Sequence, residues 1–235
     1  MMVFEGVTFA YEPGRPVLKD AGLTFGPGLT LLVGPNGCGK STLLKLAAGV
    51  ERPDSGRILV DGFDLWKREV EARRRLAYLP EFPDITPYAT LADVLRLVCR
   101  LRGEPRRAGL EALERFGLAA ESGRSVRELS SGQRKRALFA AAFVGRPGHV
   151  LLDEPLDSLD RQIADDVLRW LGERTAAGAA MVVVSHSLEP LAGLVTRAVT
   201  VHDGAASLHE EMPAGEAAKL RFLDTLARGQ DGRTA

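Results

Sequence analysis

The amino-acid sequence predicts an α/β fold with a mostly parallel β-sheet, because short apolar runs alternate with segments of helical spacing. The runs 29–33, 149–152 and 180–184 are almost continuously hydrophobic, which is typical of strands buried on both faces. Between the last two runs, apolar residues recur at helical spacing from Ile163 to Leu171. A glycine-rich turn after the first run indicates a strand–loop–helix unit.

Length and composition indicate one globular domain over 1–235. A chain of 235 residues can bury a substantial core. Hydrophobic residues make up 45% of the chain, and Lys plus Arg balance Asp plus Glu at 31 each, so we expect no nucleic acid partner. No apolar run approaches the roughly 18 residues of a membrane span, and the N-terminus lacks a signal pattern. We therefore expect a cytosolic protein.

An antiparallel β layer is predicted at the N-terminus. Residues 3–11 alternate loosely and end in a Glu-Pro-Gly turn, and a second strand is expected over 23–25. Further strands are expected within 53–62 and over 76–79, the latter ended by Pro80.

The sequence pattern then becomes helical, and a helical insertion is expected over about 84–128. Apolar residues recur at helical spacing from Leu91 to Leu101, after a possible capping box of Thr90 and Asp93. A short C-terminal extension, about 213–235, begins as an amphipathic helix.

The turn after the first apolar run has the composition of a phosphate-binding loop, GxxxxGK[ST]. In such a turn several backbone N–H groups point to one place at a helix N-terminus, where the dipole also favours an anion. Lys40 is expected to contact the β- and γ-phosphates, and Ser41 to offer its hydroxyl to Mg²⁺. The expected nucleotide-binding residues here are Gly34, Pro35, Asn36, Gly37, Cys38, Gly39, Lys40, Ser41 and Thr42.

Cys38, inside this loop, has two interpretations. A thiolate is favoured at a helix N-terminus, so alkylation of Cys38 could block nucleotide binding. The alternative is a small neutral residue that fills space. With Cys99 it is read as a free thiol, since two cysteines cannot form a metal cluster.

Two acids end the apolar run at 150–152. The carboxyl ends of parallel strands meet at one sheet edge, so Asp153 can hold Mg²⁺, directly or through water, beside Ser41. Glu154 can then polarise a water for attack on the γ-phosphate. The alternative, an exposed acidic turn before Pro155, would suit an isolated motif better than one that accompanies a phosphate loop.

His186 ends an apolar strand that runs over 181–186 and is expected at the same edge, where its imidazole can donate to the γ-phosphate. The alternative is an ordinary surface histidine whose hydrogen bonds are satisfied.

Ser130 precedes another helix, with a glycine close behind, and this makes a second anion site. One chain has no obvious need for two.

These motifs, in this order, resemble the nucleotide-binding subunit of ABC transporters over about residues 3–209. Gly34 to Thr42 match the Walker A loop, 129–133 the signature and 150–154 Walker B. Residues 156–160 match the D-loop and His186 the switch histidine. Tyr11 matches the aromatic residue that stacks on adenine, with a core tyrosine as the alternative.

The resemblance implies an ATPase with ATP and Mg²⁺ as ligands and a P-loop NTPase core. It also implies a head-to-tail dimer, homomeric or with a second ATP-binding subunit, in which Ser130, Gly132 and Gln133 close over the nucleotide of the partner. The helical insertion would dock a transmembrane permease subunit and hold the chain at the inner face of the cell membrane.

Two positions depart from the family pattern. Glu81 stands where glutamine is usual and is expected to ligate Mg²⁺, directly or through water; this variant tilts the expectation toward export. Ser131 replaces the first signature glycine, a change expected to be tolerated. Alternatives to the transporter are a soluble ABC-type ATPase with a non-transport client, and a regulatory module that binds ATP without hydrolysis.

Overall fold

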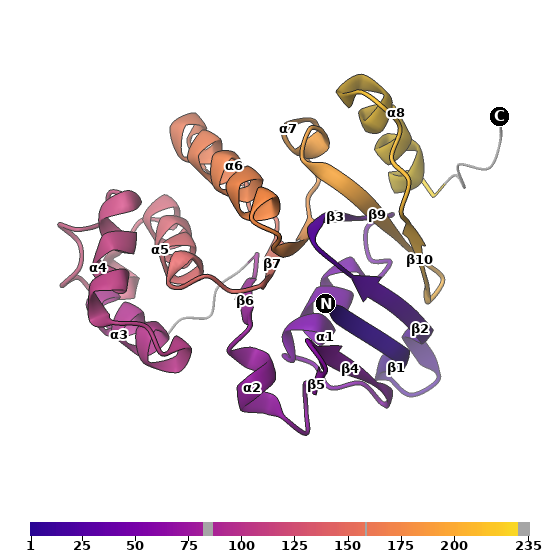
Figure 1. Ribbon diagram of the computed structural model, residues 1–235, viewed down its shortest axis with the longest axis horizontal. Coiled ribbons are helices and arrows are strands. Elements are labelled where there is room, and N and C mark those ends of the chain that lie inside the picture. Colours follow the sequence, from indigo (N-terminus) through magenta and orange to yellow (C-terminus); the bar gives the residue numbers. More distant parts are fainter. Residues whose placement is uncertain (82–86, 158, 230–235) are drawn as a thin grey trace.

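The computed structural model describes residues 1–81, 87–157 and 159–229. Two β-sheets and a set of helices form the molecule (Figure 1). The strands are β1 (Met2–Glu12), β2 (Arg15–Phe25), β3 (Gly28–Val33), β4 (Ser55–Val60), β5 (Phe63–Asp64), β6 (Leu76–Leu79), β7 (His149–Asp153), β8 (Ala180–Val184), β9 (Val195–His202) and β10 (Ala205–His209). The helices are α1 (Lys40–Ala48), α2 (Glu69–Arg73), α3 (Leu91–Arg102), α4 (Arg106–Arg115), the 3₁₀ turn η1 (Val126–Glu128), α5 (Ser131–Phe143), α6 (Arg161–Ala176), α7 (Glu189–Ala192) and α8 (Glu216–Ala227).

The central sheet has the strand order β10-β9-β3-β8-β7-β6. Strand β3 pairs in parallel with β8 and β9, and β7 pairs in parallel with β6 and β8. Only the pairing of β10 with β9 is antiparallel among the described strands of this sheet. The expectation of a mostly parallel sheet is therefore confirmed, and the loops that follow β3, β6, β7 and β8 share one edge.

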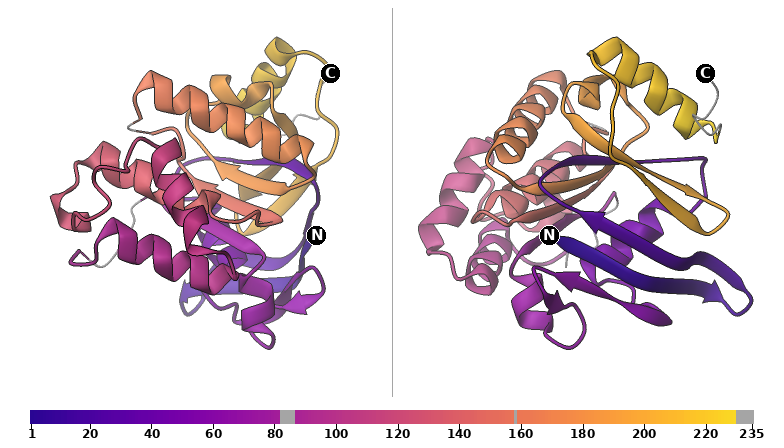
Figure 2. Two further views of the ribbon diagram at one scale, coloured as in Figure 1. Left: turned by 60° about the vertical axis from the view of Figure 1, so that its left-hand side comes forward. Right: turned by 45° about the vertical axis from the view of Figure 1, so that its right-hand side comes forward.

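Successive residues of the central strands enter two separate cores. On β8, Met181 and Val183 pack into one core, while Val182 and Val184 pack into the other. Helices α6, α7 and α8 lie on one side of the sheet, and α1 and the antiparallel sheet lie on the other (Figure 2). Burial on both faces explains why these strands read as continuous apolar runs.

The N-terminal sheet has the order β2-β1-β4-β5 and is antiparallel, as expected. Strand β2 is longer than the predicted 23–25, since it starts at Arg15. Asp20, with a φ of 47°, interrupts it, and the register shifts along its pairing with β1. This irregularity breaks the alternation by which the first half of the strand could have been recognised.

Strands β9 and β10 were not predicted. They form a hairpin whose two turn residues, Asp203 and Gly204, have φ values of 47° and 82°. Two consecutive positive values mark a type I′ turn, for which Asp-Gly is a favoured sequence. The pair Asp-Gly after the β-branched residues of 195–201 was therefore the sequence signal from which this hairpin could have been predicted.

Helices α3, α4 and α5 gather at one end of the molecule (Figure 1). The capping box of Thr90 and Asp93 is present at the start of α3. Phe116 packs against Phe139 of α5, so the helical region extends past the expected boundary at 128. Residues 84–86 of the expected insertion, and 230–235 of the C-terminal extension, lie outside the described residues. Across the described residues, no helix has the length and apolar character needed to span a bilayer.

Candidate nucleotide-binding and catalytic site

The loops at the carboxyl edge of the central sheet enclose a cavity of about 370 Å³. The cavity is lined by Tyr11, Val17, Asn36, Gly37, Gly39, Lys40, Ser41, Thr42, Glu81, Asp153, Glu154, Val184 and His186. Eleven of these thirteen residues are predicted site residues. Sequence reasoning missed Val17 and Val184, because a valine in a strand carries no signal for a ligand.

Glycines shape the phosphate loop between β3 and α1. Gly34 and Gly39 have φ values of 145° and 112°, where side chains other than that of glycine are strained. A Cβ atom on Gly34 would lie 2.8 Å from the carbonyl oxygen of Val201, and one on Gly39 would lie 2.7 Å from Cγ1 of Val17. The loop can take this path only with glycine at both positions.

Helix α1 begins at Lys40 without a side-chain cap and without an acidic residue in its first turn. Its first N–H groups are thus available to an anion at the positive end of the helix dipole. The ammonium group of Lys40 donates to the carbonyl oxygens of Gly34 at 2.8 Å and Pro35 at 3.0 Å. It therefore lies across the mouth of the loop, where a phosphate oxygen could replace these carbonyls.

Ser41 and Asp153 form the hard-oxygen pair expected of a Mg²⁺ site. The hydroxyl of Ser41 donates to Oδ1 of Asp153 at 3.4 Å. Burial raises the pKa of Asp153, and the nearby Glu81 raises it further, while the Ser41 hydrogen bond opposes both. A bound cation would offset this desolvation, so the donor set fits Mg²⁺. Among the described residues, no three acidic, histidine or cysteine side chains could hold a metal by themselves.

Glu154 is the next residue, and its main chain turns sharply there, with a φ of 47°. Its side chain is 11% exposed, and burial raises its pKa. Oε2 accepts a hydrogen bond from the backbone N–H of His186 at 3.1 Å. Oε1 lies 3.5 Å from Nε2 of His186 and makes no hydrogen bond to the described part of the chain. One carboxylate oxygen is therefore held by a hydrogen bond, while the other is buried without a hydrogen-bond partner in the described part of the chain.

His186 and Tyr11 both line the cavity and remain accessible. The side chain of His186 is 67% exposed, and Tyr11 is 54% exposed with its ring 4.9 Å from that of Phe9. The alternative of a core tyrosine is therefore wrong. Glu81 also lines the cavity, directly after β6, whereas Phe82 and Pro83 of the expected Q-loop lie outside the described residues.

The signature residues Ser130, Gly132 and Gln133 are not among the residues lining this cavity. Ser130 caps α5: its hydroxyl accepts from the N–H of Gln133 at 3.2 Å, and the Gln133 side chain accepts from the N–H of Ser130 at 3.0 Å. Gly132 has open space where a Cβ would point, so contacts described within this chain do not require a glycine.

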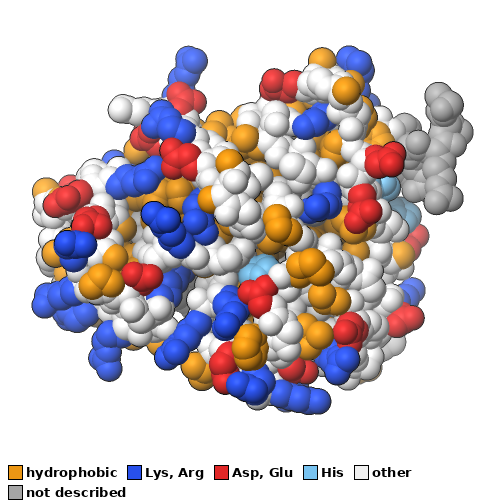
Figure 3. Space-filling model, viewed as in Figure 1, with side chains coloured by type: hydrophobic (Ala, Val, Ile, Leu, Met, Phe, Trp, Pro, Cys, Tyr) orange, Lys and Arg blue, Asp and Glu red, His pale blue; other side chains and the backbone are white. Residues whose placement is uncertain are grey.

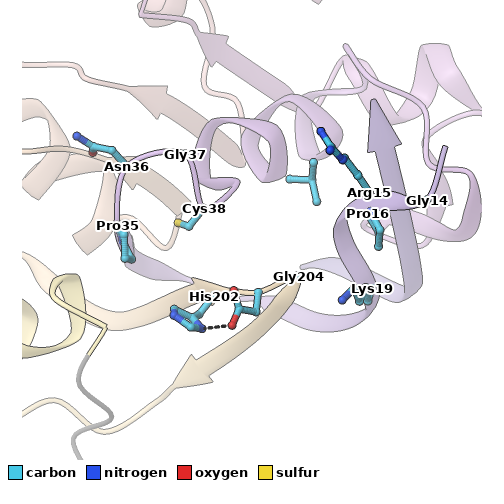
Figure 4. Close-up of a pocket in the computed structure, with 12 residues that line it drawn as sticks. Gly14, Arg15, Pro16, Lys19, Pro35, Asn36, Gly37, Cys38, His202 and Gly204 are labelled. Atoms are coloured by element: carbon cyan, nitrogen blue, oxygen red, sulfur yellow. Dashed lines mark ion pairs between the residues drawn. The ribbon is translucent and has the colours of Figure 1, made fainter. Parts of the chain in front are cut away.

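Pro35 and Cys38 of the phosphate loop are not among the residues that line the nucleotide cavity. Pro35 and Cys38 line a second hollow of about 650 Å³, which shares Asn36 and Gly37 with the nucleotide cavity. Figure 4 shows the loop facing His202 and Gly204 across this hollow. Cys38 is partly buried against the core of the N-terminal sheet, and a Cβ on Gly34 would lie 2.9 Å from its sulfur. This packing supports the interpretation of Cys38 as a space-filling residue.

The fold and site together define a nucleotide-binding α/β protein of the P-loop class. The sequence model of the ABC transporter family matches residues 18–157, and the chain belongs to that family. It is accordingly an ABC-type ATPase, and ATP is its nucleotide.

Three curated relatives of this chain are named for different processes. The chain is 35% identical to the energy-coupling factor transporter ATP-binding protein EcfA2 of Symbiobacterium thermophilum, over 86% of this chain and 75% of that protein. It is 32% identical to the cell division ATP-binding protein FtsE of Escherichia coli, over 87% and 96%. It is 35% identical to the spermidine/putrescine import protein PotA of Nitrosomonas europaea, over 75% of this chain, and spans half of that protein.

Solved structures confirm the fold. An ATP-binding subunit of an ABC transporter superposes with a TM-score of 0.83 at 24% identity, covering 100% of this chain and 95% of that chain. A dimeric structure of the bacterial ABC transporter cassette MJ0796 has a TM-score of 0.78 at 22% identity, covering 89% and 98%.

Proposed function

We propose that this chain hydrolyses ATP as the nucleotide-binding subunit of a membrane transporter, with its active site completed by a second ATP-binding subunit. The observation that carries the proposal is the convergence of Lys40, Asp153 and Glu154 on one cavity at the carboxyl edge of the sheet. Groups for phosphate binding, metal binding and general-base catalysis are therefore within reach of one γ-phosphate.

Binding of the triphosphate relies on the loop and on Lys40. The first N–H groups of α1 have no side-chain cap, so the triphosphate can bind them without displacing one. The Lys40 ammonium exchanges its two carbonyl partners for phosphate oxygens, which form stronger, charge-assisted bonds. Tyr11 and Val17 offer an aromatic ring and an apolar side chain to the base.

Ser41 and Asp153 would hold Mg²⁺, with Glu81 contributing directly or through water. When bound, the ion would neutralise charge on the β- and γ-phosphate oxygens. Glu154 takes the proton of the attacking water through Oε1, while Oε2 stays bound to the His186 amide. General-base help of this kind is worth about 10²- to 10⁴-fold in rate. His186 donates its imidazole N–H to the γ-phosphate.

Ser130 and Gly132 act on the nucleotide of the partner subunit. The Ser130 oxygen accepts from the Gln133 amide, which leaves its O–H free to donate to a phosphate. The open space beside Gly132 allows close approach of a ligand from outside the chain. A head-to-tail dimer, of two copies or of this chain and a sibling, satisfies both observations. The dimeric cassette of MJ0796 supports this arrangement.

A permease subunit docks at an apolar groove between α2 and α3. The groove, of about 420 Å³, is lined by the apolar side chains Val70, Leu76, Val98 and Leu101. Val70 and Leu101 are 61% and 62% exposed, although both are large and hydrophobic. Lys and Arg side chains gather over this part of the surface (Figure 3), and Arg73, Arg74 and Arg100 line the groove. A short amphipathic helix with acidic side chains, from a cytoplasmic loop of the permease, fits this chemistry. Such docking holds the chain at the inner face of the membrane.

The direction of transport stays a prediction. Glu81 and the compact pair α3 and α4 favour export, whereas one relative is named for import of spermidine and putrescine. The similarity to FtsE, named for cell division, supports the alternative of a client other than a transporter. Purification of the chain from its native membrane, with identification of the bound integral protein, separates these possibilities.

The test of the proposal is Glu154→Gln. The variant keeps the size of the side chain and the bond from the His186 amide, so it should bind ATP normally and lose nearly all turnover. It should also form a stable dimer with Mg·ATP, detected by size-exclusion chromatography with light scattering. Turnover within a few-fold of the native rate would contradict the role of Glu154, and a monomer at saturating Mg·ATP would contradict the shared site.

A further inference from the structure

Lys135 is a buried lysine that the catalytic roles above do not use. It lies in α5, one turn after the signature residues, and is 7% exposed. Its ammonium donates to the main-chain carbonyl oxygen of Glu154 at 2.6 Å. Burial lowers the pKa of Lys135, while Asp157, Glu154, Glu81 and Asp153 oppose that effect. A lysine is costly to bury, so a specific contact is needed to explain its position.

The contact acts on a strained part of the main chain. Glu154 has a left-handed φ of 47°, a strained conformation for a residue with a side chain. Three hydrogen bonds hold its peptide groups. Its N–H donates to Val184 of β8 at 2.9 Å, and its carbonyl accepts from the Lys135 ammonium at 2.6 Å and from the N–H of Asp157 at 3.3 Å. Lys135 therefore fixes the main-chain turn from which the Glu154 carboxylate reaches the cavity.

The same lysine connects Glu154 to the signature. Ser130 is the N-cap of α5, and Lys135 lies five positions further along the same helix. A helix of this kind moves as a rigid element, so a displacement of its N-terminus also moves the lysine. In the proposed dimer, Ser130 contacts nucleotide at one composite site, while Glu154 of the same chain serves the other.

We propose that Lys135 is a positioning residue that links the signature helix α5 to the catalytic Glu154 and thereby couples the two composite ATP sites of the dimer. This inference rests on the proposed function. It gives a role to a buried lysine whose ammonium donates to the Glu154 carbonyl. Nucleotide at one signature then favours the productive position of Glu154 in the other site.

Steady-state ATPase kinetics of Lys135→Met and Lys135→Gln test this link. Methionine keeps the length of the side chain without a donor, whereas glutamine keeps an N–H donor without the charge. Lys135→Met should lower kcat by about 10- to 100-fold, because misplacement of a catalytic group by about 1 Å can cost this much. Its Kd for ATP should stay within about twofold, and its Hill coefficient should fall from above 1 to 1. Lys135→Gln should recover most of the lost kcat and the Hill coefficient.

Lys67→Met is the matched control, since Lys67 is exposed and does not line the nucleotide cavity. It should leave kcat and the Hill coefficient unchanged. A Hill coefficient of 1 for the native chain, or a native Hill coefficient in Lys135→Met, would overturn the coupling. Native kcat in Lys135→Met would overturn the positioning role. Glu154→Gln, assayed in parallel, shows separately whether the proposed function fails. Thermal unfolding confirms that each variant folds, and if Lys135→Met does not, Lys135→Gln against Lys135→Ala provides the same comparison.

Discussion

The hydroxyl of Ser41 lies 3.4 Å from Oδ1 of Asp153, although 112 residues separate them. Ser41 follows β3, Asp153 ends β7, and β8 lies between these two strands in the sheet. The pair meets because α1 crosses the face of the sheet, in contact with β6, β7 and β8. The two proposed Mg²⁺ ligands are thus brought together by the path of α1 and not by neighbouring strands.

Lys40→Ala should weaken ATP binding by about tenfold or more, since a charge-assisted contact to the phosphates is lost. Isothermal titration calorimetry with ATP and Mg²⁺ measures the effect. Lys67→Ala removes an exposed lysine away from the cavity and should bind ATP normally. Unchanged affinity in Lys40→Ala would show that the ammonium keeps its loop carbonyls when nucleotide is bound.

Gly39→Ala should impair both folding and nucleotide binding. The new Cβ would meet Val17 at 2.7 Å at a φ of 112°, and strain of this kind costs about 1–3 kcal/mol. Thermal unfolding and ATP titration both report on it. Gly123→Ala is the control, because a Cβ there meets open space. Equal melting temperatures for the two variants would refute the tight fit between the loop and β2.

Tyr11→Ala should weaken ATP binding by about 3- to 10-fold, whereas Tyr11→Phe should retain it, because stacking requires the ring and not the hydroxyl. Inorganic triphosphate offers no base and should bind all three proteins equally. Competition titrations against a fluorescent nucleotide measure both affinities. A similar loss with triphosphate would mean that Tyr11 shapes the phosphate loop and does not contact the base.

Local patterns predicted the part of the site that is continuous in sequence. Lys40 and Ser41 sit in a loop whose glycines dictate its path, and Asp153 and Glu154 follow an apolar strand, so topology brings them to one edge. Contacts between segments that are distant in the sequence could not be predicted in this way. The contact of Lys135 with Glu154 depends on how α5 packs against the sheet, which no pattern within α5 reveals.

The signature illustrates the other limit. The capping box of Ser130 and Gln133 could be read as helix chemistry alone, and the structure shows that chemistry within the chain. The residues themselves indicated only a second anion site at Ser130, and its proposed role at the nucleotide of a partner subunit came from family resemblance. Strand β2 was only partly predicted for a different reason, because the residue at its bend, Asp20, is polar and left-handed.

Asp153 carries a stability cost that should appear as a pH dependence. Burial raises its pKa in the folded chain, so between the ordinary carboxyl pKa and the raised value the folded state binds more protons than the unfolded state. The stabilisation of the folded state by the protonated Asp153 is fully present below the ordinary carboxyl pKa. It is lost as the pH rises through the raised pKa of Asp153. At neutral pH, without Mg²⁺, the buried carboxylate therefore destabilises the chain.

Asp153→Asn removes that charge and should raise the melting temperature at pH 7.5 in the presence of EDTA. For a chain of 235 residues, each 1 kcal/mol gained corresponds to about 2–4 °C. The difference from the native chain should shrink as the pH is lowered toward the ordinary carboxyl range, and the variant should gain less stability from Mg·ATP than the native chain does. Asp165→Asn, the loss of the same charge at an exposed position, should leave the melting temperature nearly unchanged. If Asp153→Asn lowered the melting temperature at pH 7.5, the hydrogen bond from Ser41 would outweigh the cost of burying the carboxylate.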